Sequence, residues 1–267
     1  MTNQYTIDSR RTAALAEFEK LIDIIDTLRS ENGCPWDRKQ TPESLKPYIE
    51  EEAYEVIDAI DGGKPDHICE ELGDLLLQIM LQSQISFEAG TFDISDVISG
   101  LSTKMIARHP HVFADAKADT ADDVLINWEK IKATEKTNKG LLDGIPRQLP
   151  SLSRAARIGS RAAKVGFDWI TPEGVRSKVI EELEELDNAI ANAAADEIEH
   201  ELGDLLFSVA QWGRHLEQHP EEALRKTSDR FARRFALMTT ILKDQGFSLE
   251  QSSPEQMEAA WQQAKRI

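Results

Sequence analysis

The sequence predicts an all-α protein built from two tandem helical bundles. Apolar residues recur at helical spacing along most of the chain, and the periodic stretches end at glycine or proline signals. A set of carboxylates also occurs twice at one fixed offset, which indicates an internal duplication. We find no persuasive strand pattern, and 267 residues suffice for two domains of ordinary size.

The first half is expected to form five helices. An apolar stripe from Leu15 to Leu28 predicts a helix that stops at Asn32-Gly33. Thr41-Pro42 is an N-cap signal, so we expect the second helix to run from there to Gly62-Gly63, with Pro47 as the place where it would bend or split. The remaining three are expected at about 65–89, 93–109 and 124–136.

The second half repeats this plan after a segment rich in glycine and proline, which we interpret as a linker. Its helices are expected at roughly 151–164, 171–193, 196–219, 221–245 and 254–267. We therefore place a first domain at 1–138, a linker at 139–152 and a second domain at 153–267. Each bundle is small enough for helices of a second subunit to complete its core.

Composition narrows the class of partner. The formal charge of −17 argues against nucleic acid and against anionic membranes, although metal ions bound to carboxylates can still attract a phosphorylated small molecule. The chain begins without an apolar signal sequence, and no apolar run approaches the length of a membrane span. With only two cysteines as well, we expect a cytoplasmic protein without a disulfide framework.

The duplicated carboxylates are the main candidates for chemistry. Each acid of the first half recurs 130 residues further along the chain, and the two sets are Glu52, Glu55, Glu71, Asp74 and Glu182, Glu185, Glu201, Asp204. Each set places two acids one turn apart on each of two neighbouring helices, an arrangement that can hold Mg²⁺ through oxygen ligands. An acidic run is usually a solvated helix face. Here all four acids persist while neighbours differ, for example Glu70 against His200, which favours a metal site.

Basic and aromatic residues supply the complementary half of a phosphate site. Arg230, Arg233 and Arg234 share one predicted helix, and Trp261 precedes Lys265 by one turn on the last helix. The first half carries a similar set, namely Lys104, Arg108, Trp128 and Lys132. Arginine can bind phosphate oxygens in bidentate fashion, and tryptophan can stack on a base. The alternative is that both tryptophans are core anchors with solvated lysines nearby.

Several segments resemble the MazG nucleoside triphosphate pyrophosphohydrolases, over nearly the whole chain and in the tandem form of the family. They are Gly33-Cys34-Pro35-Trp36-Asp37, Gln40-Thr41-Pro42-Glu43-Ser44-Leu45, Glu51-Glu52-Ala53-Tyr54-Glu55, Glu70-Glu71-Leu72-Gly73-Asp74 and Arg108-His109-Pro110-His111-Val112-Phe113. The resemblance implies an all-α NTP pyrophosphatase fold and a homodimer. It also implies Mg²⁺-dependent hydrolysis of NTPs or dNTPs to monophosphate and pyrophosphate, with Mn²⁺ as a possible substitute. In tandem members the second domain is generally credited with the activity.

The resemblance also suggests roles for the residues of the second half. Glu182, Glu185, Glu201 and Asp204 would hold Mg²⁺, and Glu181 or one of these ligands would act as the base. The residues expected to contact substrate are Lys178, Arg230, Arg233, Arg234, Trp261, Lys265 and, from the first half, Lys132. A hypothesis from a different class is a catalytically silent helical module that binds protein partners through its acidic repeats.

Overall fold

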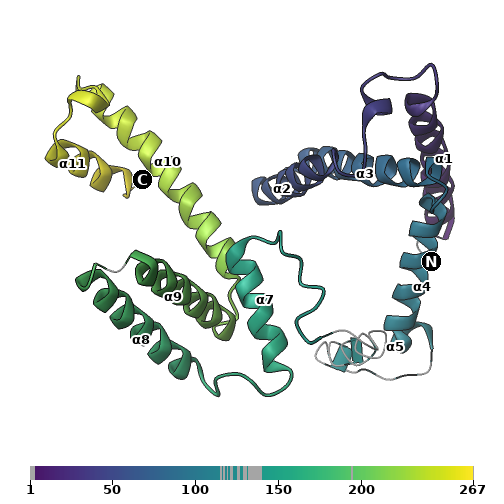
Figure 1. The fold of residues 1–267 in the computed structure, drawn as a ribbon. Helices are drawn as coiled ribbons and strands as arrows, with labels where there is room; N and C mark the ends of the chain where they lie inside the picture. The colour runs from purple at the N-terminus through teal and green to yellow at the C-terminus, as the bar shows by residue number, and fades with distance from the viewer. Residues whose placement is uncertain are drawn as a thin grey trace. The chain divides into compact units, whose positions relative to one another are not determined.

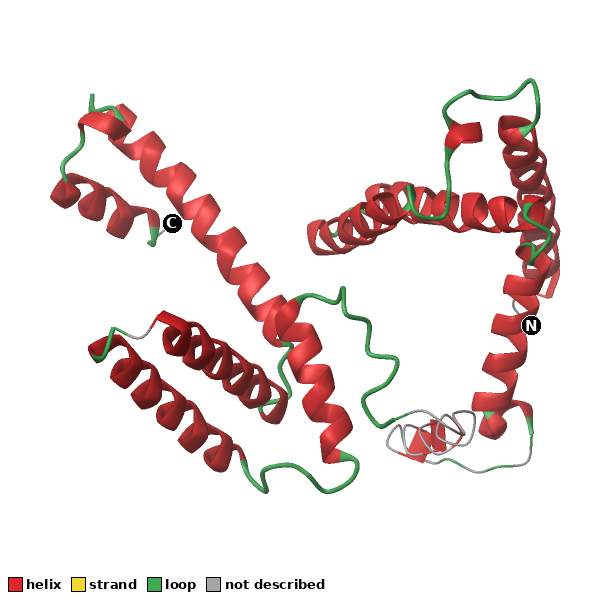
Figure 2. Cartoon of the chain, viewed as in Figure 1, coloured by secondary structure: helices red, strands yellow, loops and turns green. Residues whose placement is uncertain are grey.

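The computed structural model describes residues 4–114, 140–193 and 195–266, together with 116, 118, 120, 123, 124, 127, 128 and 131. Within these residues the regular elements are helices and none is a strand, so the predicted all-α class is confirmed (Figures 1 and 2). The chain divides into two compact units, Met1–Thr137 and Asn138–Ile267. None of the described helices combines the length and the apolar character needed to cross a membrane.

The first unit is built around one long helix. Its elements are α1 (Gln4–Arg29), the 3₁₀ helix η1 (Asp37–Lys39), α2 (Lys46–Gly62), α3 (Pro65–Glu88), α4 (Ile94–Arg108) and the single turn α5 (Pro110–Phe113). α3 packs along α2 and also contacts α1 and α4. Of the helix predicted at 124–136, Val124, Asn127, Trp128 and Ile131 are helical, and the other positions lie outside the described residues.

The predicted start of the second helix was wrong. Thr41 and Ser44 instead form a turn, in which each backbone N–H donates to the other side chain, at 2.9 Å from Thr41 N and 3.2 Å from Ser44 N. α2 begins at Lys46 with Pro47 in its first turn. Proline is well tolerated there because the N–H that it lacks would have no partner within the helix. Pro47 therefore starts the helix and does not bend it.

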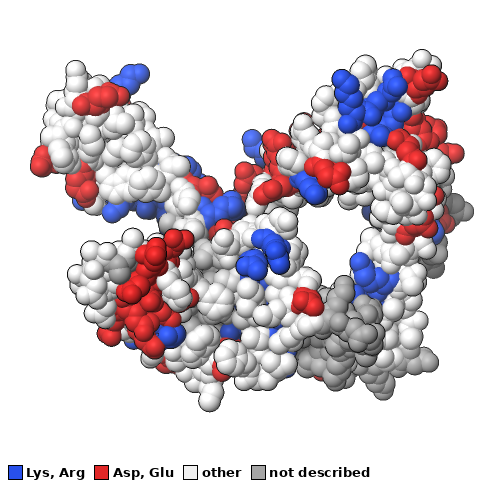
Figure 3. Space-filling view, viewed as in Figure 1, with Lys and Arg blue, Asp and Glu red and all other residues white. Residues whose placement is uncertain are grey.

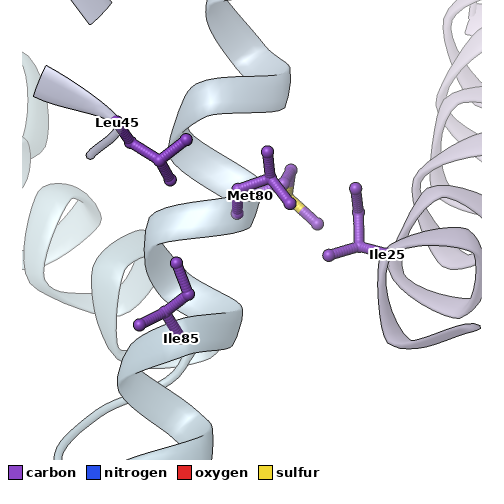
Figure 4. Close-up of a cluster of buried hydrophobic side chains, with 5 residues drawn as sticks. Ile25, Leu45, Met80 and Ile85 are labelled. Atoms are coloured by element: carbon purple, nitrogen blue, oxygen red, sulfur yellow. The ribbon is translucent and has the colours of Figure 1, made fainter. Parts of the chain in front are cut away.

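The core of the first unit lies at the junction of α1, α3 and the turn that precedes α2. Ile25, Leu45 and Met80 are almost fully buried and point toward one another, with Leu81 and Ile85 completing the cluster (Figure 4). Burying side chains of this size contributes roughly 1.5–3 kcal/mol each. This cluster therefore fixes α3, which carries two of the acids, against the rest of the unit.

The second unit contains an equivalent central helix pair, followed by a long helix with a shorter helix packed along it. Its elements are α7 (Ser151–Ala163), α8 (Pro172–Ala191), α9 (Ala195–His215), α10 (Pro220–Asp244), η2 (Leu249–Gln251) and α11 (Pro254–Ala264). α8 and α9 lie side by side, α7 packs on α9, and α11 folds back along α10 (Figure 1). Met238, Leu242, Ala260 and Ala264 form the buried core between α10 and α11.

α9 ends at His215, four residues before the end that the pattern predicted. Glu217 adopts a left-handed conformation with φ of 56°, and the Gln218 N–H donates back to the Gly213 carbonyl at 2.9 Å. These features belong to a helix-terminating turn that usually carries glycine at the left-handed position. Because glutamate occupies this position, no glycine marks the end of α9 in the sequence.

Candidate metal and nucleotide site

Three carboxylates converge in the second unit. Glu182 and Glu185 lie one turn apart on α8, Glu201 lies on α9, and one oxygen from each falls within 4.8 Å of the others. Glu182 is 5% exposed, whereas Glu185 is exposed at the rim. Acidic side chains gather in a band over α8 and α9 (Figure 3). A compact set of carboxylate oxygens that is buried on one side suits a hard divalent cation.

Lys178 is the cation that neutralises part of this cluster. Its Nζ donates to Glu181 Oε1 at 2.8 Å and lies 2.9 Å from Glu182 Oε1. Hydrogen bonds to Glu181 and then to Glu182 raise the pKa of Lys178 well above its usual value. Desolvation, followed by the hydrogen bond with Glu182, raises the pKa of Glu185, and the Lys178 charge partly offsets that rise. Lys178 thus ties Glu181, the candidate base, to a candidate ligand.

In the second unit the fourth predicted acid, Asp204, belongs to a neighbouring group with His200 and Glu201. Asp204 Oδ2 lies 3.0 Å from His200 Nδ1, and the same nitrogen lies 3.8 Å from Glu201 Oε1. The structure therefore brings three of the four predicted acids of the second unit together and pairs the fourth with a histidine.

The first unit contains the matching triad, Glu52, Glu55 and Glu71, with the same 4.8 Å convergence. Desolvation is the main cause that raises the pKa of Glu52, and the charge of Asp74 is the next largest. Glu71 is 8% exposed, and its Oε1 lies 2.9 Å from His67 Nε2. Each unit therefore carries its own equivalent carboxylate triad.

The two units differ in the side chain at the position of Lys178, next to the triad. The position 130 residues before Lys178 is Tyr48, whose ring packs edge-on against Trp36 with the centroids 5.8 Å apart. Tyrosine cannot supply a positive charge to the neighbouring carboxylates. Near the triad of the first unit, the described counterpart of Lys178 is therefore an aromatic side chain.

Four of the basic residues predicted for the second unit line a pocket between α10 and α11, whereas Lys178 lies on α8 with Glu181 and Glu182. The pocket has a volume of about 460 Å³, and Leu237 and Ala264 are its uncharged lining residues. Its charged walls comprise the predicted Arg230, Arg233, Arg234 and Lys265, together with Arg266. Reasoning from the sequence missed Arg266, although its position directly after Lys265 in an acidic chain was a usable signal.

Trp261 lies next to this pocket and is partly buried. Its ring centroid is 5.0 Å from that of Phe231 and 6.0 Å from Lys265 Nζ, and it packs against the α10–α11 core. In the first unit Arg108 lies over the ring of Trp128, at 5.3 Å from its centroid. Lys132, also predicted to contact substrate, lies outside the described residues.

A second group that the sequence did not reveal holds the loop before α8. Asp168 accepts from Arg214 at 2.8 and 2.5 Å and lies 2.9 Å from His215 Nε2. The Arg214 guanidinium is the main cause that holds the pKa of Asp168 well below its usual value. In sequence, Arg214 lies 46 residues and His215 47 residues after Asp168.

Together these features define a class: an all-α protein with two repeated helix pairs, each carrying a carboxylate triad. Residues 40–113 and 170–235 match the MazG nucleotide pyrophosphohydrolase domain. The chain is 47% identical over 250 residues to the nucleoside triphosphate pyrophosphohydrolase/pyrophosphatase MazG of Thermotoga maritima, covering 93% of this chain and 95% of that one. It is 43% identical over 256 residues to the nucleoside triphosphate pyrophosphohydrolase of Escherichia coli K12, covering 94% and 97%. The chain belongs to the MazG family of nucleotide pyrophosphohydrolases, as the motifs suggested.

Proposed function

We propose that this chain hydrolyses nucleoside triphosphates, of both the ribo and deoxy series, to the monophosphate and pyrophosphate, and that the reaction depends on Mg²⁺. The observation that carries the proposal is the triad Glu182, Glu185 and Glu201 in a MazG-family chain, with Lys178 beside it. Such an activity would serve the upkeep of the nucleotide pool.

The donor set of the triad fits the proposed metal. Carboxylate oxygens from two helices are the ligands that Mg²⁺ prefers, and Mn²⁺ accepts the same set. When bound, Mg²⁺ would supply positive charge that offsets the triphosphate and polarises the reacting phosphoryl group. Glu182, Glu185 and Glu201 would hold the ion, and Asp204 would join them on leaving His200.

The side chains of the chain itself would position and deprotonate the attacking water. Lys178 fixes the Glu181 carboxylate at 2.8 Å, so that Glu181 can accept the proton of a water molecule. The cations of the α10–α11 pocket would neutralise the oxygens of the departing pyrophosphate. Trp261, at the edge of that pocket, would stack on the base through the part of its ring that remains accessible.

A homodimer is part of the proposal. Large apolar side chains remain exposed on the same helices that carry the acids, among them Ile57, Ile60, Leu72, Ile79, Ile180, Leu183, Leu202 and Leu206. Many large apolar side chains exposed on the same few helices are typical of association surfaces. A second copy of the chain would cover these faces, and a monomeric mass in sedimentation equilibrium would contradict this.

The proposal is tested by Glu185→Gln beside the control Glu184→Gln. Both residues are exposed on α8, but only Glu185 belongs to the triad. Glu185→Gln keeps the size of the side chain and removes a charged ligand, so we expect pyrophosphate release from dATP to fall by at least about a hundredfold. Glu184→Gln should retain wild-type turnover.

The assay is run with Mg²⁺, with Mn²⁺ and with excess chelator, and the helical content of each variant is checked by circular dichroism. Activity in chelator, or full activity of a folded Glu185→Gln variant, would rule out the metal-dependent reaction. A rise in the melting temperature of the wild type at low Mg²⁺ that Glu185→Gln removes would show specific binding of the ion. A catalytically silent interaction module would show no turnover with any nucleotide.

A further inference from the structure

The pocket between α10 and α11 concentrates positive charge in a chain of net charge −17. Five cationic side chains line about 460 Å³, and the other two lining residues, Leu237 and Ala264, carry no charge. Among the described residues none of the five cations has a carboxylate partner within 4.0 Å. Arg230 donates to the Thr227 hydroxyl at 3.0 Å, and Lys265 lies over Trp261.

Acidic residues that lie near these five cations in sequence have other partners. Glu222 and Asp229 of α10 pair with Arg225 at 2.8 and 3.1 Å, and Glu222 also lies 3.0 Å from Lys226. On α11, Glu258 accepts a hydrogen bond from Gln262 at 2.6 Å. Within the described part of the chain the charge of the pocket therefore has no carboxylate counterion, and it is available to an anion from solution.

We propose that this pocket binds inorganic pyrophosphate without help from a divalent cation, with Arg266 as one of its ligands, and that the retained product inhibits the enzyme competitively. The inference rests on the proposed function and adds a regulatory property to the same site. Pyrophosphate would then slow its own formation until it is removed, which requires a reaction that consumes it.

The chemistry of the pocket favours pyrophosphate over orthophosphate. Guanidinium groups bind phosphate oxygens in bidentate pairs, and four arginines with one lysine offer more donors than a single phosphate group can accept. Two linked phosphate groups engage more of these donors and carry more charge. We therefore expect the pocket to bind pyrophosphate at least about tenfold more tightly than orthophosphate, a difference that corresponds to one charged hydrogen bond.

Isothermal titration calorimetry of the full-length chain with inorganic pyrophosphate in excess EDTA tests the proposal. We expect saturable binding in the wild type and binding at least about tenfold weaker in Arg266→Gln, because one charged donor is lost. The matched control is Lys226→Gln, which removes a cation from α10 outside the pocket and leaves Glu222 paired with Arg225. Binding to this control should stay within about twofold of wild type, since exposed charges are screened.

Two results would overturn the inference: no saturable pyrophosphate binding in EDTA, or the same loss of affinity in Lys226→Gln as in Arg266→Gln. The double variant Glu182→Gln with Glu185→Gln separates this inference from the proposed function. It should lose hydrolysis and still bind pyrophosphate in EDTA like the wild type. In steady-state assays pyrophosphate should inhibit competitively against dATP, and the inhibition constant should rise about tenfold in Arg266→Gln, by the same loss of one charged hydrogen bond.

Discussion

Asp168 shows how one side chain fixes a segment that leads into the site. Its two oxygens are shared between Arg214 and His215 of α9, and the loop that carries it runs directly into α8. The carboxylate is 21% exposed and Arg214 18%, so water screens the pair only in part. A bidentate, partly buried pair of this kind contributes more than an exposed one.

We expect Asp168→Asn to lower the free energy of unfolding at pH 7 by about 2–3 kcal/mol, because Arg214 loses a charged partner. Since the pKa of folded Asp168 lies below that of the unfolded chain, its contribution is fully present above the unfolded value of about 3.9 and is lost as the pH falls through the folded pKa. The difference between wild type and variant should therefore narrow below about pH 4. Urea unfolding at several pH values measures it.

Asp229→Asn is the matched control for that experiment. Asp229 pairs with Arg225 at 3.1 Å but is 55% exposed, so its loss should cost less than about 1 kcal/mol. An Asp168→Asn variant as stable as this control at pH 7 would show that the network around Arg214 does not stabilise the second unit.

Helices are the part of the fold that the sequence predicted best. α3, α8, α10 and α11 begin at or next to the residues expected, because a proline marks the first turn of each. The errors have local causes: two prolines competed for the start of α2, and α9 ends on a left-handed glutamate where glycine is usual. The spacing of apolar residues indicates neither the start of α2 nor the end of α9.

The candidate site was predictable where it is repeated in sequence. The recurrence of the acids at a fixed offset pointed to Glu182, Glu185 and Glu201, and the structure brings these three together. The link from Asp168 to α9 could not be predicted, because its partners are distant in sequence and the first unit does not copy them. Offset 130 places Gln84 and Ile85 where the second unit has Arg214 and His215.

The contact between α7 and α9 yields a prediction at the scale of the helix pair. A Cβ at Gly159 would overlap the Gln211 side chain, which is fully buried and donates to the Ala155 carbonyl at 2.7 Å. We expect Gly159→Ala to destabilise the protein by about 1–3 kcal/mol through overpacking. In α9, Gly203→Ala meets nothing within 4 Å and should stabilise by up to about 1 kcal/mol. Equal melting temperatures for the two variants would contradict this packing.

At the scale of the whole molecule, the two units carry the same acids with different cationic partners. The second unit has Lys178 in contact with Glu181 and Glu182 and five cations around one pocket. In the first unit Tyr48 occupies the position of Lys178. Hydrolysis develops charge on the departing pyrophosphate, which the cations of the second unit are placed to stabilise. We therefore expect the second unit to dominate turnover.

The most direct test of this account is pyrophosphate release from dATP in Mg²⁺ by two double variants of the full-length chain. Glu182→Gln with Glu185→Gln should abolish turnover, whereas Glu52→Gln with Glu55→Gln should retain most of it, because Lys178 and the pocket cations that would stabilise the departing pyrophosphate belong to the second unit. The comparison is matched, since each pair removes the same two charges from an equivalent triad. Comparable losses from both pairs would mean that both units are catalytic. Loss from the first-unit pair alone would place the reaction in the other half of the molecule.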